Sequence, residues 1–216
     1  INKRFSRAAN LKLGHIIVPV GLNNAHHEPL NYFTVYRPEG EDMILPSTWH
    51  DTGISFWGRS GKFSYEVELL AGLNAMLFNR DRWIHHGAGS PFEFKPANQY
   101  GFAARVDYRL MPGLRIGVSG YYGNSAHNTY PNDLKGDGKP YDNVKGTVAM
   151  GAIDLTLNRW NWIVRGQADY GYVGDTEKLN IIKDAKAHAS NSPVKSAMIG
   201  KNAVCMGIEA GYDIFS

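Results

Sequence analysis

The chain has 216 residues, of which 12% are aromatic and 24 are glycines, and this combination is typical of a β protein. Its net charge of +3 is modest and the basic residues are spread along the chain, so the composition does not indicate a nucleic-acid partner. The single cysteine, Cys205, excludes an intrachain disulfide and a multi-thiol metal site.

The apolar residues do not form a membrane-spanning helix. No stretch approaches the roughly 20 consecutive apolar residues that such a helix needs, and the mean hydropathy is −0.35. Barrel strands alternate lipid-facing apolar residues with polar residues that face the lumen, so their mean hydropathy resembles that of other proteins. Export to an outer membrane requires a signal peptide, and none precedes Ile1, so we expect the sequence to be processed or incomplete at that end.

The first predicted elements are a strand near residues 11–20 and a hairpin. Residues 52–56 and 63–73 alternate apolar and polar side chains around a turn at residues 60–62. The two strands of the hairpin therefore each present one apolar face.

Two further hairpins follow in chain order. Residues 100–110 and 114–122 alternate strictly around the turn Met111-Pro112-Gly113. Residues 153–157 and 162–172 do the same around the turn at 158–161, and a last strand lies near 204–214. Several aromatic residues fall toward strand ends, where amphipathic rings suit a membrane interface: Tyr100, Tyr108, Tyr122, Trp162 and Tyr172.

The connections between these strands alternate between short turns and long polar segments. The long segments lie near residues 22–50, 75–98, 124–145 and 175–202. Short periplasmic turns and long external loops are typical of outer-membrane barrels. The pattern predicts an all-β antiparallel transmembrane barrel of about eight strands in one domain. A soluble β-sandwich also alternates and stays open as an alternative.

A more specific pattern spans residues 14–58. Residues 14–24, GHIIVPVGLNN, are followed by Arg37-Pro38, by Pro46-Ser47-Thr48-Trp49 and by the strand at 53–58. This order resembles the phosphate-selective porin O and P family in its Bacteroidota form. The resemblance implies a bacterial outer-membrane location and a larger barrel of about 16 to 18 strands, of which this chain is a portion. A genuine small barrel, whose interior side chains would fill, is the alternative.

In a porin, charges that line the narrowest part of the lumen set selectivity, and arginines favour anions. Strand parity points five arginines inward: Arg59, Arg105, Arg109, Arg115 and Arg165. The alternative is structural pairing of these arginines with inward carboxylates. The carboxylates of that alternative are Glu66, Glu68, Asp107, Asp154, Asp169, Glu209 and Asp213.

The segment at residues 22–50 is polar, aromatic and framed by prolines. It is a candidate for a constriction loop that folds into the lumen, and the alternative is an ordered external loop. As a constriction, it would supply four lumen-facing residues: His26, His27, Arg37 and Trp49.

Neither a metal site nor an enzyme site is indicated by the histidines or by Ser119. The histidines at 26–27 and 85–86 do not have the spacing of a defined metal site, so we expect solvated loop residues and no cofactor or metal. Ser119 lies inside a strand pattern and not at a strand-to-helix elbow, so we expect no hydrolase.

The leading functional hypothesis is a porin-like channel for passive diffusion of small solutes, anions among them. The alternative is a plugged structural or adaptor barrel that binds proteins through its external loops. Five inward glycines leave interior volume unfilled in this interpretation, which favours the channel: Gly53, Gly72, Gly101, Gly117 and Gly171. The expected partners are outer-membrane lipid, lipopolysaccharide, small solutes, and a homotrimer or outer-membrane protein complex.

Overall fold

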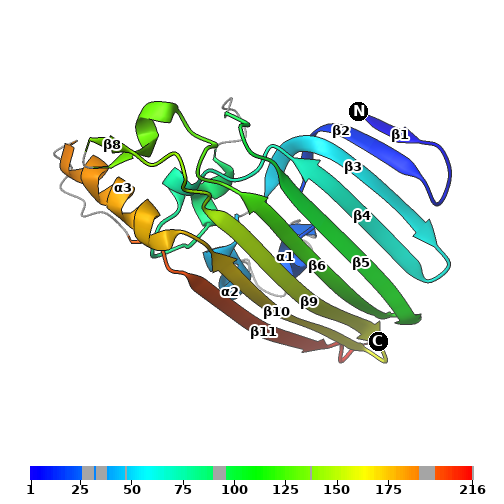
Figure 1. Ribbon diagram of the computed structural model, residues 1–216. Helices are drawn as coiled ribbons and strands as arrows, with labels where there is room; N and C mark the ends of the chain where they lie inside the picture. Colours follow the sequence, from blue (N-terminus) through cyan, green and yellow to red (C-terminus); the bar gives the residue numbers. More distant parts are fainter. Residues whose placement is uncertain are drawn as a thin grey trace.

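The computed structural model describes residues 1–25, 32, 38–46, 48–89, 96–136, 138–189 and 198–215. Its main feature is a nine-stranded antiparallel sheet in which the strands follow the order β1-β2-β3-β4-β5-β6-β9-β10-β11 (Figure 1). Across the described part of the chain, none of the helices has the length and apolar character needed to cross a membrane.

The elements are the following. The sheet contains β1 (Asn2–Arg4), β2 (Asn10–Ile17), β3 (His50–Ser60), β4 (Phe63–Leu70), β5 (Gly101–Met111), β6 (Leu114–Asn124), β9 (Thr147–Arg159), β10 (Trp162–Val173) and β11 (Asn202–Tyr212). A separate two-stranded sheet contains β7 (Lys135–Gly136) and β8 (Lys139–Pro140). The helices are α1 (Leu22–Ala25), α2 (Glu39–Ile44) and α3 (Thr176–Ala189), with short 3-10 helices η2 (Ala75–Leu77), η3 (His85–Ala88) and η4 (Pro131–Leu134).

The prediction of an all-β antiparallel fold is confirmed, whereas the strand count was one short for the main sheet. The additional strand, β1, is only three residues long and pairs with β2, so it was too short to show alternation. Strands β1 and β11 are the two edges of the sheet. The described residues therefore form an open sheet and not the closed small barrel that was one alternative.

Three short turns join neighbouring strands at one end of the sheet, which we call the turn end. Trp160 and Asn161 have φ values of 55° and 64°, the left-handed backbone of a two-residue hairpin turn whose twist matches that of its strands. Gly113, with φ of 85°, follows Pro112 in the β5–β6 turn, and Gly61, with φ of 57°, lies in the β3–β4 turn. The opposite end, the loop end, receives the long connections.

The alternation of side chains gives the sheet an inner and an outer face. Residues 18–25 and 38–46, between β2 and β3, lie on the inner face, and Figure 1 shows α1 and α2 on that side of the sheet. The outer face is exposed. Many of its large apolar residues are 45% to 79% exposed, while Leu13, Ile17 and Leu69 are 37% to 38% exposed. The more exposed residues include Ile54, Phe56, Phe63, Val67, Phe102, Val106, Val118, Tyr122, Ile153, Trp162, Tyr170, Val204, Met206, Ile208 and Tyr212.

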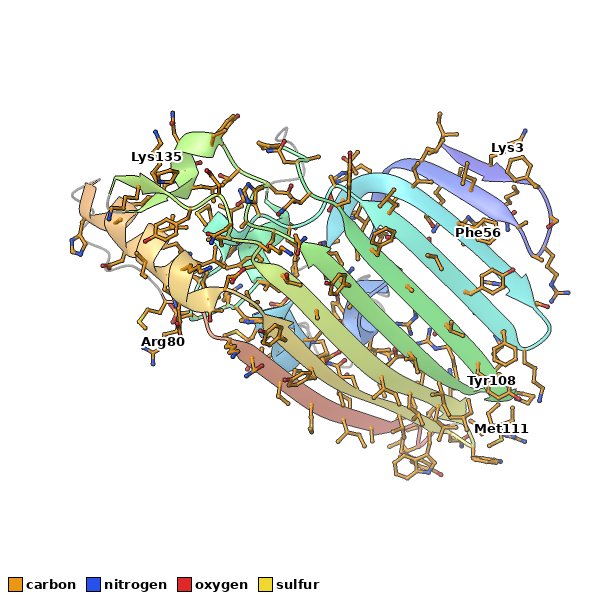
Figure 2. All side chains as sticks on the ribbon, viewed as in Figure 1. Lys3, Phe56, Arg80, Tyr108, Met111 and Lys135 are labelled. Carbon is orange, nitrogen blue, oxygen red and sulfur yellow. The ribbon has the colours of Figure 1, made fainter. Side chains whose placement is uncertain are left out.

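Charge is absent from nearly all of the outer face. In the described strands β2 to β6 and β9 to β11, the outward positions hold no Asp, Glu or Lys, and the one outward Arg is Arg159 at the last position of β9, beside the turn. Aromatic residues lie toward both strand ends, as predicted. The Phe63 ring lies 4.7 Å from that of Tyr108, which Figure 2 shows near the turn end. Tyr122 and Tyr170 lie near the other ends of β6 and β10, toward the loop end.

The long connections at the loop end pack together. Leu179 and Ile182 of α3 are buried with Phe78 and Ile84 in one hydrophobic core that continues onto the sheet. Lys183 donates hydrogen bonds to the carbonyls of Met76 and Phe78. The segment at 175–202 was expected to be a polar loop, and this was wrong for residues 176–189, which form α3 (Figure 1).

The inward glycines were interpreted as unfilled interior volume, and this was wrong for all five, because a Cβ added at any of them would lie less than 3.0 Å from another atom. The indole of Trp83 occupies the space where a Cβ of Gly171 would lie. The Tyr121 ring does the same at Gly101, and the Arg105 and Asp154 side chains do so at Gly117. These glycines admit large side chains from neighbouring elements, so they contribute to a packed interior.

Candidate functional site

The described part of the β2–β3 connection lies on the inner face of the sheet. Its two ends meet where the Val18 amide donates to the Trp49 carbonyl at 2.9 Å. Val18, Val20 and Leu45 are at most 1% exposed, which places them in the core between this segment and the sheet. We call residues 18–25 and 38–46 the inner segment. Its position agrees with a segment that folds inward, while its role as a pore constriction stays a prediction.

Gly21 ties the inner segment to β5 and β6. Arg105 Nη1 donates to the Gly21 carbonyl at 2.9 Å, and the Gly21 amide donates to Ser119 Oγ at 3.1 Å. Gly21 has φ of 79°, a backbone conformation that residues other than glycine rarely adopt. Both backbone groups of one residue are therefore held by the wall of the sheet.

Glu41 of α2 holds the start of α1. Its carboxylate accepts hydrogen bonds from the backbone amides of Leu22 and Asn23 at 3.2 and 3.0 Å, and from Asn23 Nδ2 at 2.9 Å. Burial of the Glu41 carboxyl and the negative charge of Asp169 raise its pKa to about 7, against the lowering effect of the amide hydrogen bonds. Asn23 Nδ2 also donates to Gln167 on β10, so this contact reaches the sheet.

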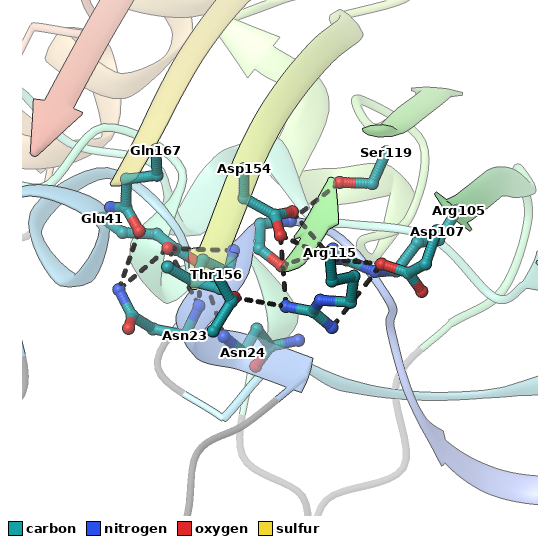
Figure 3. A network of polar contacts seen from close by, with 12 residues as sticks. Asn23, Asn24, Glu41, Arg105, Asp107, Arg115, Ser119, Asp154, Thr156 and Gln167 are labelled. Atoms are coloured by element: carbon teal, nitrogen blue, oxygen red, sulfur yellow. Dashed lines mark hydrogen bonds and ion pairs between the residues drawn. The ribbon is translucent and has the colours of Figure 1, made fainter. Parts of the chain in front are cut away.

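Two arginines and two aspartates, Arg105, Arg115, Asp107 and Asp154, form an ion-pair network (Figure 3). Arg105 Nη2 lies 2.7 Å from Asp154 Oδ2 and 2.8 Å from Asp107 Oδ1. Arg115 lies 3.3 Å from Asp154 Oδ1 and 3.5 Å from Asp107 Oδ1, and it donates to Thr156 Oγ1 at 3.0 Å. The Arg105 side chain is 5% exposed and that of Asp154 is fully buried, so the charges depend on each other for compensation.

The five predicted pore-lining arginines occupy three environments. Arg105 and Arg115 are the paired members of the network, so the structural alternative describes their contacts. Arg59 and Arg109 are exposed close to the turn end, and Arg165 is partly buried on β10. The structure thus brings Arg109, Arg115 and Arg165 together around one cavity, whereas Arg59 lines a neighbouring one. Their role as pore-lining residues stays a prediction.

Of the four candidates for a constriction loop, the structure describes Trp49. Trp49 was expected to face the lumen, and this was wrong: it is 1% exposed, and its ring lies 5.0 Å from that of Tyr121 in the core. Apolar burial of the indole explains this position. His26, His27 and Arg37 lie outside the described residues.

Sequence reasoning missed Gly21, Glu41 and Asn23, which hold the inner segment in place. The hydrogen bond from the Gly21 amide to Ser119 joins residues that are 98 positions apart in the chain. Helix α2, which contains Glu41, has only six residues, too few to show a helical periodicity in the sequence. The sequence signal for this contact was a glycine directly after Pro19-Val20, because a glycine can adopt the positive φ that Gly21 has in the structure.

A second charged cluster lies on the inner face near β2. Lys12 Nζ is 2.6 Å from Glu66 Oε1, which also accepts a hydrogen bond from Ser55 at 2.5 Å. Glu68 is 1% exposed beside them. Among the side chains that the structure describes, no group of three or more His, Cys, Asp or Glu residues could hold a metal ion.

The sequence was compared with protein-family models and with known proteins. No family model matches the sequence. An uncharacterized protein from Aquifex aeolicus (strain VF5) is 27% identical over 188 residues, which is 84% of this chain. The chain spans about 39% of the length of that relative. The resemblance to the phosphate-selective porin O and P family stays a prediction.

Proposed function

We propose that this sheet is part of the wall of an outer-membrane β-barrel, and that the whole protein is a porin-like channel for passive diffusion of small solutes. The observation that carries the proposal is the outer face, which is apolar, exposed and almost free of charge across eight neighbouring strands. Monomeric soluble proteins rarely expose a contiguous apolar patch of more than a few hundred Å².

The strand lengths support the same proposal. Strands β5, β6 and β11 each have 11 residues, which is the length that a tilted strand needs to cross the hydrocarbon layer. Aromatic residues toward both ends would lie at the two interfaces. Short turns at one end and long connections at the other also match the arrangement of such barrels.

The inner face supports a polar lumen. Its strands carry the charged residues of the sheet, including the Arg105–Asp154 pair and the Lys12–Glu66 pair. Charges on the lumen side determine which ions pass, because fixed potentials attract counter-ions.

One observation favours the second candidate, a plugged barrel that binds partner proteins through its external loops. The inner segment is held at Gly21 and by Glu41, and its apolar residues are packed against the sheet. A barrel with this segment fixed in its interior would conduct little, and the packed layer at the loop end would then be the binding surface.

The test is single-channel conductance of the full-length native protein in a planar bilayer, with a salt gradient to measure the reversal potential. Flotation with lipid vesicles and resistance to urea extraction establish insertion first. Stepwise conductance is the expected result. Insertion without conductance would replace the channel with the plugged barrel, and failure to insert would overturn both.

A further inference from the structure

A cavity of about 790 Å³ opens at the turn end, between α1 and the turns that join β3 to β4 and β5 to β6. Small-molecule sites usually have volumes of about 300 to 1,000 Å³. The cavity lies on the inner face, beyond the ion-pair network, and the sequence did not indicate it. Its lining divides into a basic part and an apolar part.

The basic part contains Lys62, Arg109, Arg115 and Arg165, and no carboxylate side chain is among the described residues that line the cavity. Strand register explains the concentration of charge. Arg109 lies directly opposite Arg115 across β5 and β6, and Thr156 separates Arg115 from Arg165 in the same row. The row therefore brings three guanidinium groups to one wall.

Like charges that face each other across neighbouring strands are unfavourable. The two aspartates next to this row, Asp107 and Asp154, are already matched by Arg105 and Arg115. The negative charges of Asp107 and Asp154 therefore do not also neutralise the positive charges of Lys62 and Arg109. Glu209 faces Arg165 across β10 and β11, but it does not line the cavity. An anion in the cavity would relieve this excess of positive charge.

The apolar part contains Leu22 of α1 and the turn residues Met111, Pro112 and Leu114. A compact inorganic ion would leave this surface in contact with water. A ligand with an apolar body would bury it, at a gain that grows with the apolar area removed from water.

We propose that this cavity binds amphipathic organic anions, with a carboxylate against Arg109 and Arg115 and a short apolar body against Leu22, Met111 and Leu114. That such anions also pass through the protein rests on the proposed channel. Their binding to the cavity can be tested without transport.

The experiment is isothermal titration of the full-length protein in detergent micelles with hexanoate, and empty micelles are titrated in parallel to subtract partitioning. Acetate supplies the charge without the apolar body, 1-hexanol supplies the body without the charge, and inorganic phosphate is the compact anion. Hexanoate is expected to bind at least about tenfold more tightly than each of the three, because only hexanoate satisfies both parts of the lining.

Variants locate the site. Arg109→Gln should weaken hexanoate binding about tenfold, and Arg109→Lys should retain most of the affinity because it keeps the charge. Met111→Ser should weaken hexanoate binding and leave acetate binding unchanged. The matched control is Arg80→Gln, an exposed arginine at the opposite, loop end (Figure 2), which should change nothing. Circular dichroism of each variant establishes that the fold is retained.

The outcomes separate the two proposals. Equal affinity for phosphate and hexanoate, or no binding of hexanoate to the folded protein, would overturn the inference. Conductance without hexanoate binding would leave the channel intact and remove this site. Hexanoate binding that Arg109→Gln weakens, in a protein that never conducts, would support the site and refute the channel.

Discussion

The two faces of the sheet are built from the same strands, yet they differ in almost every physical property. On β6, Val118 of the outer face is 55% exposed, and its neighbour Ser119 on the inner face is 6% exposed and bonded to Gly21. The outer face holds apolar side chains that are largely exposed. The inner face holds ion pairs, buried amides and a folded segment.

This difference teaches which environment each face requires. In water, the polar face of a sheet is normally the exposed one and the apolar face is covered. Here the arrangement is inverted, because the covered face carries the charges and the exposed face is apolar. An apolar solvent around the outer face would remove the contradiction, and four comparisons between variants test whether the two faces differ in this way.

The largest effect is expected on the inner face. Arg105→Met leaves Asp154 buried beside a single partner, and breaking a buried ion pair in this way costs about 3 to 5 kcal/mol. Urea unfolding of the full-length protein in lipid vesicles measures the free energy. The matched control, Arg59→Met, removes an exposed arginine and should change stability by less than about 0.5 kcal/mol.

The double variant Arg105→Met with Asp154→Leu should recover much of the loss, since both charges are then absent. If Arg105→Met is as stable as Arg59→Met, water reaches the network and solvates Asp154. The conclusion that the inner face is tightly packed around this network would then be wrong.

The second effect concerns the outer face. Val118→Arg places a charge at the middle of β6, where a bilayer penalises it by about 2 to 4 kcal/mol. Leu110→Arg, near the turn end of β5, should cost only about 0 to 1 kcal/mol at the interface. The same urea titration in vesicles compares the two variants. If both substitutions change stability by less than about 0.5 kcal/mol, the outer face lies in water.

The sequence predicted this division of the strands well, because alternation is a local property. Residues 100–122 alternate strictly, and the turn Pro112-Gly113 lies where the structure has it. The structure of the long connections was not predictable in the same way. The Gly21–Ser119 contact and the packing of α3 depend on residues that are distant in the chain.

The glycines illustrate the limit most clearly. Inward glycines were interpreted as empty space, but the side chain that fills the space at Gly171 is Trp83, 88 positions earlier in the chain. Parity reveals the face on which a residue lies and not what packs against it. Parity therefore predicted a strand face for each site arginine, while the contacts of Arg105 and Arg115 with Asp107 and Asp154 depend on the fold.

The third effect compares two glycines on opposite faces. Gly171→Ala should cost about 1 to 3 kcal/mol, because the new methyl group overlaps the Trp83 indole in a packed interior. Gly151→Ala adds the same group to the outer face of β9, where no described atom other than those of its two chain neighbours lies within 4 Å of it. It should change stability by less than about 0.5 kcal/mol. Thermal unfolding of both variants gives the difference, and equal stabilities would show that Trp83 does not occupy this position.

The last effect is local and depends on pH. Burial of Glu41 and the charge of Asp169 raise the pKa of Glu41 from 4.5 to about 7, so the folded inner segment binds a proton that the opened segment releases. The stabilising contribution is fully present below pH 4.5 and is lost as the pH rises to about 7, at up to about 1.4 kcal/mol per pH unit. Hydrogen-exchange protection factors of the Leu22, Asn23 and Asn24 amides should therefore fall by up to about tenfold per unit across this range.

Two variants decide whether Glu41 is the responsible group. Glu41→Gln cannot ionise, so the protection of these amides should become independent of pH between 4.5 and 7. Glu39→Gln, at an exposed position on the same helix, should keep the pH dependence of the native protein. A pH dependence that survives in Glu41→Gln would assign it to another group of the inner face. The inner segment would then be held mainly by Gly21 and by apolar packing, because neither of these titrates in this range.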